Sequence, residues 1–184
     1  DLATDANGAL TSTAAQIVNA INGNAAAAAK VRAFRYRGFA IAGTGIAHSE
    51  FNHSKTETVH FLQIWIVPDR RGVAPRYQQV HFPQDSKRGR LRLIISPDGQ
   101  DGSLGVYQDV RVYAGLFDGA DCDALELGQK RHAYVHVARG QASINGVALG
   151  EGDGARLRGE PQVRVENGVN AELLADLASE LTLL

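Results

Sequence analysis

Short runs that alternate apolar and polar residues dominate the chain from residue 58 onward. Stretches rich in Gly, Pro, Asn and Asp separate these runs, a pattern typical of β-strands joined by turns. The predicted strands are 59–67, 77–82, 91–96, 103–108, 110–117, 133–140, 142–146, 163–166 and 171–177. Many short strands at regular spacing predict an all-β sandwich or barrel. Asn145-Gly146 and Asn167-Gly168 predict tight hairpin turns, because both residue types tolerate positive φ.

In the N-terminal part of the chain, apolar residues recur with the period of a helix rather than that of a strand. Thr13 followed by Gln16 forms a capping-box pattern, and apolar residues at 17, 18 and 21 then fall on one helical face. The Ala-rich run 25–33 favours a second helix, because alanine loses no side-chain entropy on becoming helical. We therefore expect one or two short helices within 12–33.

Charge and hydropathy exclude several classes of partner. The 184 residues carry 19 Lys and Arg against 20 Asp and Glu, a formal net charge of −1, so no basic footprint for nucleic acid or an anionic membrane exists. The arginines at 90 and 92 alternate with leucines and are interpreted as the solvated face of a strand. No apolar run has transmembrane length and no signal-peptide pattern opens the chain. We expect a cytoplasmic protein with no membrane partner.

The single cysteine, Cys122, excludes an intrachain disulfide. Its neighbours Asp121 and Asp123 would raise the pKa of a thiol, which argues against a nucleophile. The sequence contains no methionine, so we expect that residue 1 is not the translated start.

Most histidines do not form a metal-binding pattern. His132 and His136 lie four apart in a predicted strand, so they share a face but are separated by roughly 13 Å at their Cα atoms. One ion cannot bind both. His60 and His81 are isolated in predicted strands, where a structural role is the simpler interpretation.

His48 and Glu50 differ from these. Their offset of two places both side chains on one face of an extended segment, about 7 Å apart at Cα, where an imidazole and a carboxylate can converge on one ion. This donor pair suits Fe, Mn, Ni, Cu or Zn alike, so the pattern does not specify the metal.

The motifs "GIAHSEFN", "HFLQIWI", "PRYQQ", "SPDGQDGSL" and "GDGA" together resemble those of bacterial pirin-like proteins of the cupin superfamily. The resemblance covers residues 42–177. It implies two stacked cupin barrels, of which the N-terminal one holds a divalent metal through three histidines and a glutamate. Two of those histidines come from an early His-x-His motif. The others come from a "GxxHSE" motif, here Gly45 to Glu50, which implies that His48 and Glu50 are ligands.

The His-x-His half of the implied site has no counterpart in this sequence. His48 is the first histidine, and Asp1 and Asp5 are the only carboxylates before it. Residues 1–41 resemble a phage structural protein segment instead. We interpret the chain as a fusion or rearrangement with four parts: a foreign helical segment 1–41, a remnant of the N-terminal cupin 42–57, a C-terminal cupin barrel (a β-sandwich or jelly roll) 58–177, and a tail 178–184.

Two functions from different classes follow. The missing histidines favour a metal-poor binding or scaffold module. The alternative is quercetin 2,3-dioxygenase activity on a flavonol, with His48 and Glu50 as ligands of Fe, Ni, Cu, Mn or Zn, His53 recruited as a third ligand, and Glu50 also acting as the catalytic proton acceptor. Open strand edges left by a truncated barrel predict homodimerisation by strand exchange.

Overall fold

The computed structural model describes residues 52, 54–74 and 77–179. The helices predicted within 12–33, and the candidate ligands His48, Glu50 and His53, lie outside these residues. The chain divides into two compact units, and the second, Ile64–Arg70 with Arg76–Leu184, holds all of the strands assigned in the described residues. Among the described residues, no helix is long and apolar enough to cross a membrane.

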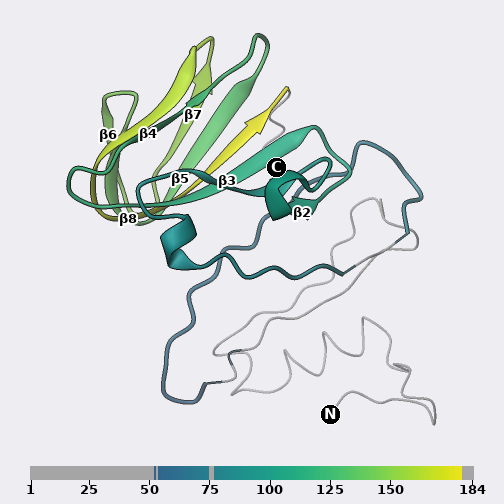
Figure 1. The fold of residues 1–184 in the computed structure, drawn as a ribbon, viewed down its shortest axis with the longest axis horizontal. Helices are drawn as coiled ribbons and strands as arrows, with labels where there is room; N and C mark the ends of the chain where they lie inside the picture. Colours follow the sequence, from purple (N-terminus) through teal and green to yellow (C-terminus); the bar gives the residue numbers. More distant parts are fainter. Residues whose placement is uncertain (1–51, 53, 75–76, 180–184) are drawn as a thin grey trace. The chain divides into compact units, whose positions relative to one another are not determined.

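Most of the regular secondary structure in the described part of the second unit is strand (Figure 1). Two short 3-10 helices, η1 (Gln84–Ser86) and η2 (Gln100–Gly102), flank the first strand. The strands are β1 (Arg92–Ser96), β2 (Leu104–Gly105), β3 (Val110–Phe117), β4 (Asp123–Glu126), β5 (His132–Ile144), β6 (Val147–Gly150), β7 (Gly154–Arg158) and β8 (Gln162–Ala178).

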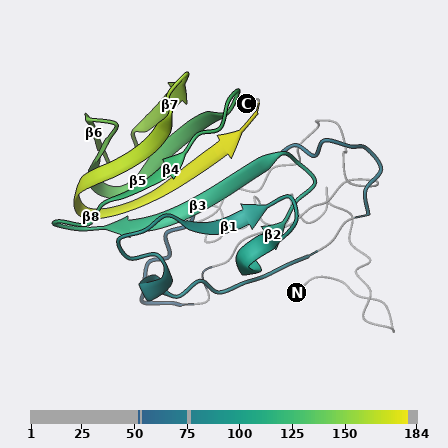
Figure 2. The same ribbon diagram turned by 45° about the horizontal axis from the view of Figure 1, so that its top comes forward.

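The two long strands β5 and β8 each pass through two layers. The first half of β5 pairs with β7 and with the end of β8, whereas its second half pairs with β6 and with the start of β8. Strand β8 likewise pairs first with β4 and then with β3, and β3 pairs with β1. Figure 2 shows the resulting curvature. One layer is therefore β2-β1-β3-β8-β5-β7 and the other is β4-β8-β5-β6.

The apolar core lies between these layers. Alternation along β5 buries Ala133, Val135 and Val137 in the first layer. The second half of the same strand contributes Ala142 and Ile144, so the buried positions change from odd to even numbers. This change coincides with register shifts between β5 and β8 from Val137 to Ser143. A bulge of this kind bends a strand and lets it continue into the second layer.

Two sequence expectations were wrong. The segments 59–67 and 77–82 form no strand in this structure. A strand requires backbone partners on a neighbouring segment, and apolar alternation alone does not supply them. Asn167-Gly168 is not a hairpin turn, because it lies inside β8, where Asn167 and Asn170 have φ of 55° and 45°. Asn145-Gly146 is confirmed as the β5–β6 turn, with φ of 47° and 83°.

The outer face of the first layer carries a smaller apolar cluster. It contains Val110, Val112 and Ala178, with Ile66, Ile94, Ile95, Val106 and Leu174 packed against them. Two polar side chains share this face. Asp176 lies opposite Tyr134 of β5 and Val112 of β3, and His132 lies opposite Ala178. The Oδ1 atom of Asp176 and the Nδ1 atom of His132 are both buried without a hydrogen-bond partner.

Candidate functional site

The described residues do not form a metal centre. Within 52, 54–74 and 77–179, no group of three or more His, Cys, Asp or Glu side chains could hold an ion. His132 and His136 share a face of β5, as predicted, and both are half-buried opposite the core. The metal site that the family resemblance implies involves His48 and Glu50, which lie outside the described residues, so the role of His48, Glu50 and His53 stays a prediction.

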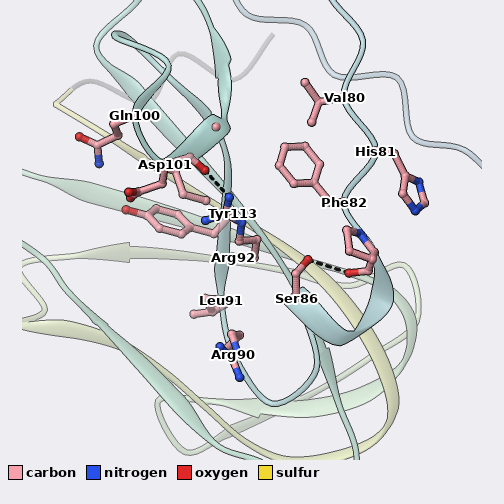
Figure 3. Close-up of a pocket in the computed structure, with 13 residues that line it drawn as sticks. Val80, His81, Phe82, Ser86, Arg90, Leu91, Arg92, Gln100, Asp101 and Tyr113 are labelled. Atoms are coloured by element: carbon pink, nitrogen blue, oxygen red, sulfur yellow. Dashed lines mark hydrogen bonds between the residues drawn. The ribbon is translucent and has the colours of Figure 1, made fainter.

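A cavity of about 530 Å³ lies between the extended segment 80–83 and strand β1. This volume falls within the range of small-molecule sites, which is roughly 300–1,000 Å³. Its lining comes from segment 80–83, η1, β1, η2 and β3: Val80, His81, Phe82, Pro83, Ser86, Arg90, Leu91, Arg92, Leu93, Gln100, Asp101, Gly102 and Tyr113. Figure 3 shows Val80 and Phe82 turned toward β1, whereas the His81 imidazole points to the other side of its segment.

Aliphatic side chains line the inner part of the cavity. Leu91 and Leu93 are 7% and 5% exposed, whereas Arg90 between this strand and the preceding turn is exposed. Arg92 lies in β1 and is half-buried, whereas Arg90 lies before the strand, so only Arg90 has the exposure that the sequence predicted and only Arg92 has the predicted strand. Tyr113 is the partner of Leu93 in the β1–β3 pairing and packs against the central core. The cavity therefore lies at the edge of the core and is open to solvent.

Arg92 connects the two walls of the cavity. Its guanidinium carbon lies 5.7 Å from the centroid of the Phe82 ring. A guanidinium at this distance is attracted by the electrons of the ring face. The same guanidinium donates a hydrogen bond from Nη2 to the carbonyl oxygen of Asp101 (Figure 3). Segment 80–83 and η2 are therefore both held against β1 through one side chain.

Hydrogen bonds from buried serine hydroxyls hold the loop that carries η2. The Ser96 side chain is fully buried, with its Oγ 2.8 Å from Oγ of Ser103 and 2.9 Å from Oδ1 of Asp98. The hydrogen bond from Ser96, and a second from the backbone N–H of Gln100, lower the pKa of Asp98. Gly99 and Asp101 have φ of 70° and 54°, which makes the chain turn tightly enough to return to β2. This network places Gln100 and Asp101 at the mouth of the cavity.

The charge of the cavity wall is positive. Arg90 and Arg92 contribute two cations, and Asp101 contributes one exposed carboxylate. Among the described residues, the Arg90 guanidinium has no ion-pair or hydrogen-bond partner. Burial raises the pKa of the Tyr113 phenol, so this group stays protonated and can donate a hydrogen bond at neutral pH.

This cavity was not predicted from the sequence. Arg92 had no predicted partner, because Phe82 lies in a segment that was predicted to be a strand. The only sequence feature that indicated the cavity was an aromatic residue, Phe82, shortly before the alternating arginines and leucines of 90–93. That signal is common in amphipathic strands and does not by itself indicate a site.

Two curved layers joined by continuous strands around one apolar core form a β-barrel of the jelly-roll kind, to which cupins belong. Residues 93–176 match the family model described as the quercetinase C-terminal cupin domain. The chain is a pirin-like member of the cupin class. The cupin fold and the family membership expected from the sequence motifs are thereby confirmed.

Curated relatives cover more of the chain than the family model does. The chain is 38% identical over 133 residues to a quercetin 2,3-dioxygenase of Escherichia coli strain K12, which covers 72% of this chain and 56% of that protein. It is 32% identical over 134 residues to a pirin-like protein of Caulobacter vibrioides, with 72% and 57% covered. The match spans little more than half the length of each relative.

A solved structure gives the same assignment. The bacterial pirin YhhW of Escherichia coli in complex with nickel(II) superimposes with a TM-score of 0.58 at 29% sequence identity, covering 64% of this chain and 49% of that one. A second structure of YhhW gives a TM-score of 0.59 at 28% identity, with 65% and 50% covered. The nickel belongs to YhhW.

Proposed function

We propose that this chain acts as a pirin-like binding module whose C-terminal cupin does not depend on a metal. The observation that carries the proposal is the composition of the cavity wall. Phe82, Tyr113 and two leucines provide apolar surface, and Arg90 and Arg92 provide charge, whereas metal-binding side chains do not gather there. Cavities of this composition hold organic ligands by shape and by a few placed polar groups.

The candidate metal ligands in the N-terminal part of the sequence support the same proposal. Of the four donors that the family resemblance implies, the 184 residues contain counterparts of two, His48 and Glu50. Metal ligands act as a set, and an incomplete set binds weakly without the neighbouring groups that orient it.

The second candidate function is quercetin 2,3-dioxygenase activity. It is favoured by the 38% identity to a relative of that name. In this reading His48, Glu50 and His53 would hold a divalent transition metal, which would supply the binding point for a flavonol, and Glu50 would accept the proton of the flavonol hydroxyl. The homodimer predicted from the sequence would be compatible with either function.

The two candidates differ in how His48 and Glu50 respond to metal. For a module without a working metal site, His48→Ala and Glu50→Ala should each change the free energy of unfolding by no more than about 0.5 kcal/mol, as at ordinary surface positions. The melting temperature of the parent chain should not rise with added Ni²⁺, Fe²⁺, Cu²⁺, Mn²⁺ or Zn²⁺. Thermal unfolding followed by circular dichroism provides both measurements.

Glu57→Ala, which removes an exposed carboxylate nearby in sequence, is the matched control. A ligand that binds only the native state raises the melting temperature, and above Kd the rise grows with the logarithm of the ligand concentration. A rise of this kind with one of these metals in the parent and in Glu57→Ala, but not in His48→Ala or Glu50→Ala, would favour the dioxygenase instead.

A further inference from the structure

We propose that Asn167-Gly168 is a site of spontaneous deamidation, at which Asn167 is converted to an aspartyl or isoaspartyl residue. The backbone nitrogen of Gly168 attacks Cγ of Asn167, the bond from Cγ to Nδ2 breaks, and ammonia leaves with the proton of the attacking nitrogen. Water then opens the resulting succinimide ring at either of its carbonyl groups. The net reaction consumes water and releases ammonia, so it needs no enzyme, metal or oxidant and is independent of the proposed binding function.

The Asn167-Gly168 peptide lies in a part of β8 that is not paired with a neighbouring strand. The pairing of β8 with β5 passes from Glu166 directly to Val169. Pairing with β4 ends at Val165, and pairing with β3 begins at Ala171. Among the described strands, this peptide therefore has no ladder partner. A backbone held by few hydrogen bonds opens locally more readily than a paired strand, which gives the reacting atoms freedom to approach each other.

The reacting groups are accessible to solvent and to each other. The Asn167 side chain is exposed, and among the described residues its amide has no hydrogen-bond partner. No bond has to break before its Cγ moves toward the Gly168 nitrogen. Gly168 has no Cβ that would shield this nitrogen from the attack.

Asn145-Gly146 provides a comparison within the same chain. Both asparagines precede Gly-Val, so their intrinsic reactivities are similar. The Asn145 side chain, however, accepts a hydrogen bond at Oδ1 from the backbone N–H of Arg164, at 2.7 Å, and donates one from Nδ2 to the carbonyl oxygen of Gln162, at 2.9 Å. These bonds must break before Cγ can reach the next backbone nitrogen. Their loss should slow the reaction by about tenfold or more.

The isoaspartyl product should destabilise the bend of β8. Its main chain runs through the former side chain and is one methylene longer. Gly168 is buried, and its carbonyl oxygen accepts a hydrogen bond from the N–H of Gly119 at 2.9 Å. A Cβ on Gly168 would lie 2.6 Å from the carbonyl oxygen of Phe117, so this residue has no room to shift toward β3. We expect aged protein to unfold at a lower urea concentration than fresh protein.

Rates of deamidation at the two asparagines test the proposal. The full chain is incubated at pH 8 in buffer and, in parallel, in concentrated urea. Trypsin then places Asn145 in peptide 140–156 and Asn167 in peptide 165–184, and mass spectrometry follows the conversion of amide to acid in each. Fragment spectra distinguish Asn167 from Asn170. In buffer, Asn167 should convert at least about tenfold faster than Asn145, whereas in urea the two rates should be nearly equal.

Asn167→Gly is the matched control variant. Asn167 has φ of 55°, a conformation that glycine adopts without strain, and glycine has no amide to lose. Ageing should lower the urea midpoint of the parent chain but not through this position in Asn167→Gly, which should therefore lose less stability. Gly168→Ala is unsuitable, because its methyl group would overlap the backbone of Phe117.

Three results would overturn the proposal. In the first, Asn145 converts as fast as Asn167 in buffer. In the second, Asn167 stays intact in buffer over the time in which it converts in urea. In the third, the fragment spectra place the change at Asn170. Equal losses of stability on ageing in the parent and in Asn167→Gly would contradict the expected effect on the bend of β8.

Discussion

Gly140→Ala should lower the free energy of unfolding by about 3 kcal/mol or more. Gly140 has φ of 67°, a conformation that costs an L-residue about 1–2 kcal/mol. A methyl group there would also overlap the carbonyl oxygens of Val169 and Asn170 on β8. These are backbone atoms that cannot rotate away, and overpacking of this kind costs about 1–3 kcal/mol. The position is the bulge at which β5 leaves one layer of the barrel for the other.

Gly146→Ala is the matched control for this prediction. Gly146 has φ of 83° but no atom within 4 Å of an added Cβ, so only the backbone strain remains. Urea unfolding followed by far-ultraviolet circular dichroism should therefore place Gly140→Ala well below Gly146→Ala in stability. Equal stabilities of the two variants would contradict the close approach of β5 and β8 at this bulge.

Asp176→Asn should stabilise the protein at pH 8 and have little effect at pH 4. Burial raises the pKa of Asp176 from 3.8 to about 6, and its Oδ1 atom has no partner. Between these two pH values the native state binds more protons than the unfolded state, so stability falls as pH rises through this window. Above pH 6 the native state carries the full penalty of a buried carboxylate, about 2–3 kcal/mol for a shift of this size.

Removing the charge removes that penalty. Urea unfolding at pH 4 and pH 8 should show Asp176→Asn more stable than the parent by about 2 kcal/mol at the higher pH only. Asp85→Asn changes the same charge at an exposed position and should stay within about 0.5 kcal/mol of the parent at both pH values. A stabilisation by Asp176→Asn that is equal at pH 4 and pH 8 would show that burial does not raise this pKa.

The fold was largely predictable from local patterns. The run 110–117 coincides with β3, because its alternation reflects a strand with one face on the core. The predicted runs 133–140 and 142–146 proved to belong mainly to one strand, β5, and 163–166 with 171–177 to another, β8. In the sequence, Gly140 and Asn167-Gly168 look like the ends of strands. In the structure they are bends in strands that continue into a second layer. Local sequence does not distinguish a bend from a turn, because both use positive φ.

The candidate sites differ in how far sequence could predict them. His48 and Glu50 came from a motif of adjacent residues, which sequence shows directly. The cavity brings Phe82, Arg92 and Tyr113 together from a non-strand segment, β1 and β3, and the pairing of Leu93 with Tyr113 is a property of the sheet rather than of either strand. A site assembled by strand register is not visible until the register is known.

Metal content and oxygen consumption with quercetin test the central claim most directly. The full chain would be incubated with Ni²⁺, Fe²⁺, Cu²⁺ or Mn²⁺, dialysed, and assayed for bound metal by mass spectrometry and for oxygen uptake on adding quercetin. We expect less than about 0.1 equivalent of retained metal, since a two-donor site binds weakly, and oxygen uptake no faster than with the same metal alone. Close to one equivalent of metal, with quercetin-dependent oxygen uptake that Glu50→Ala abolishes, would contradict the account of this chain as a binding module.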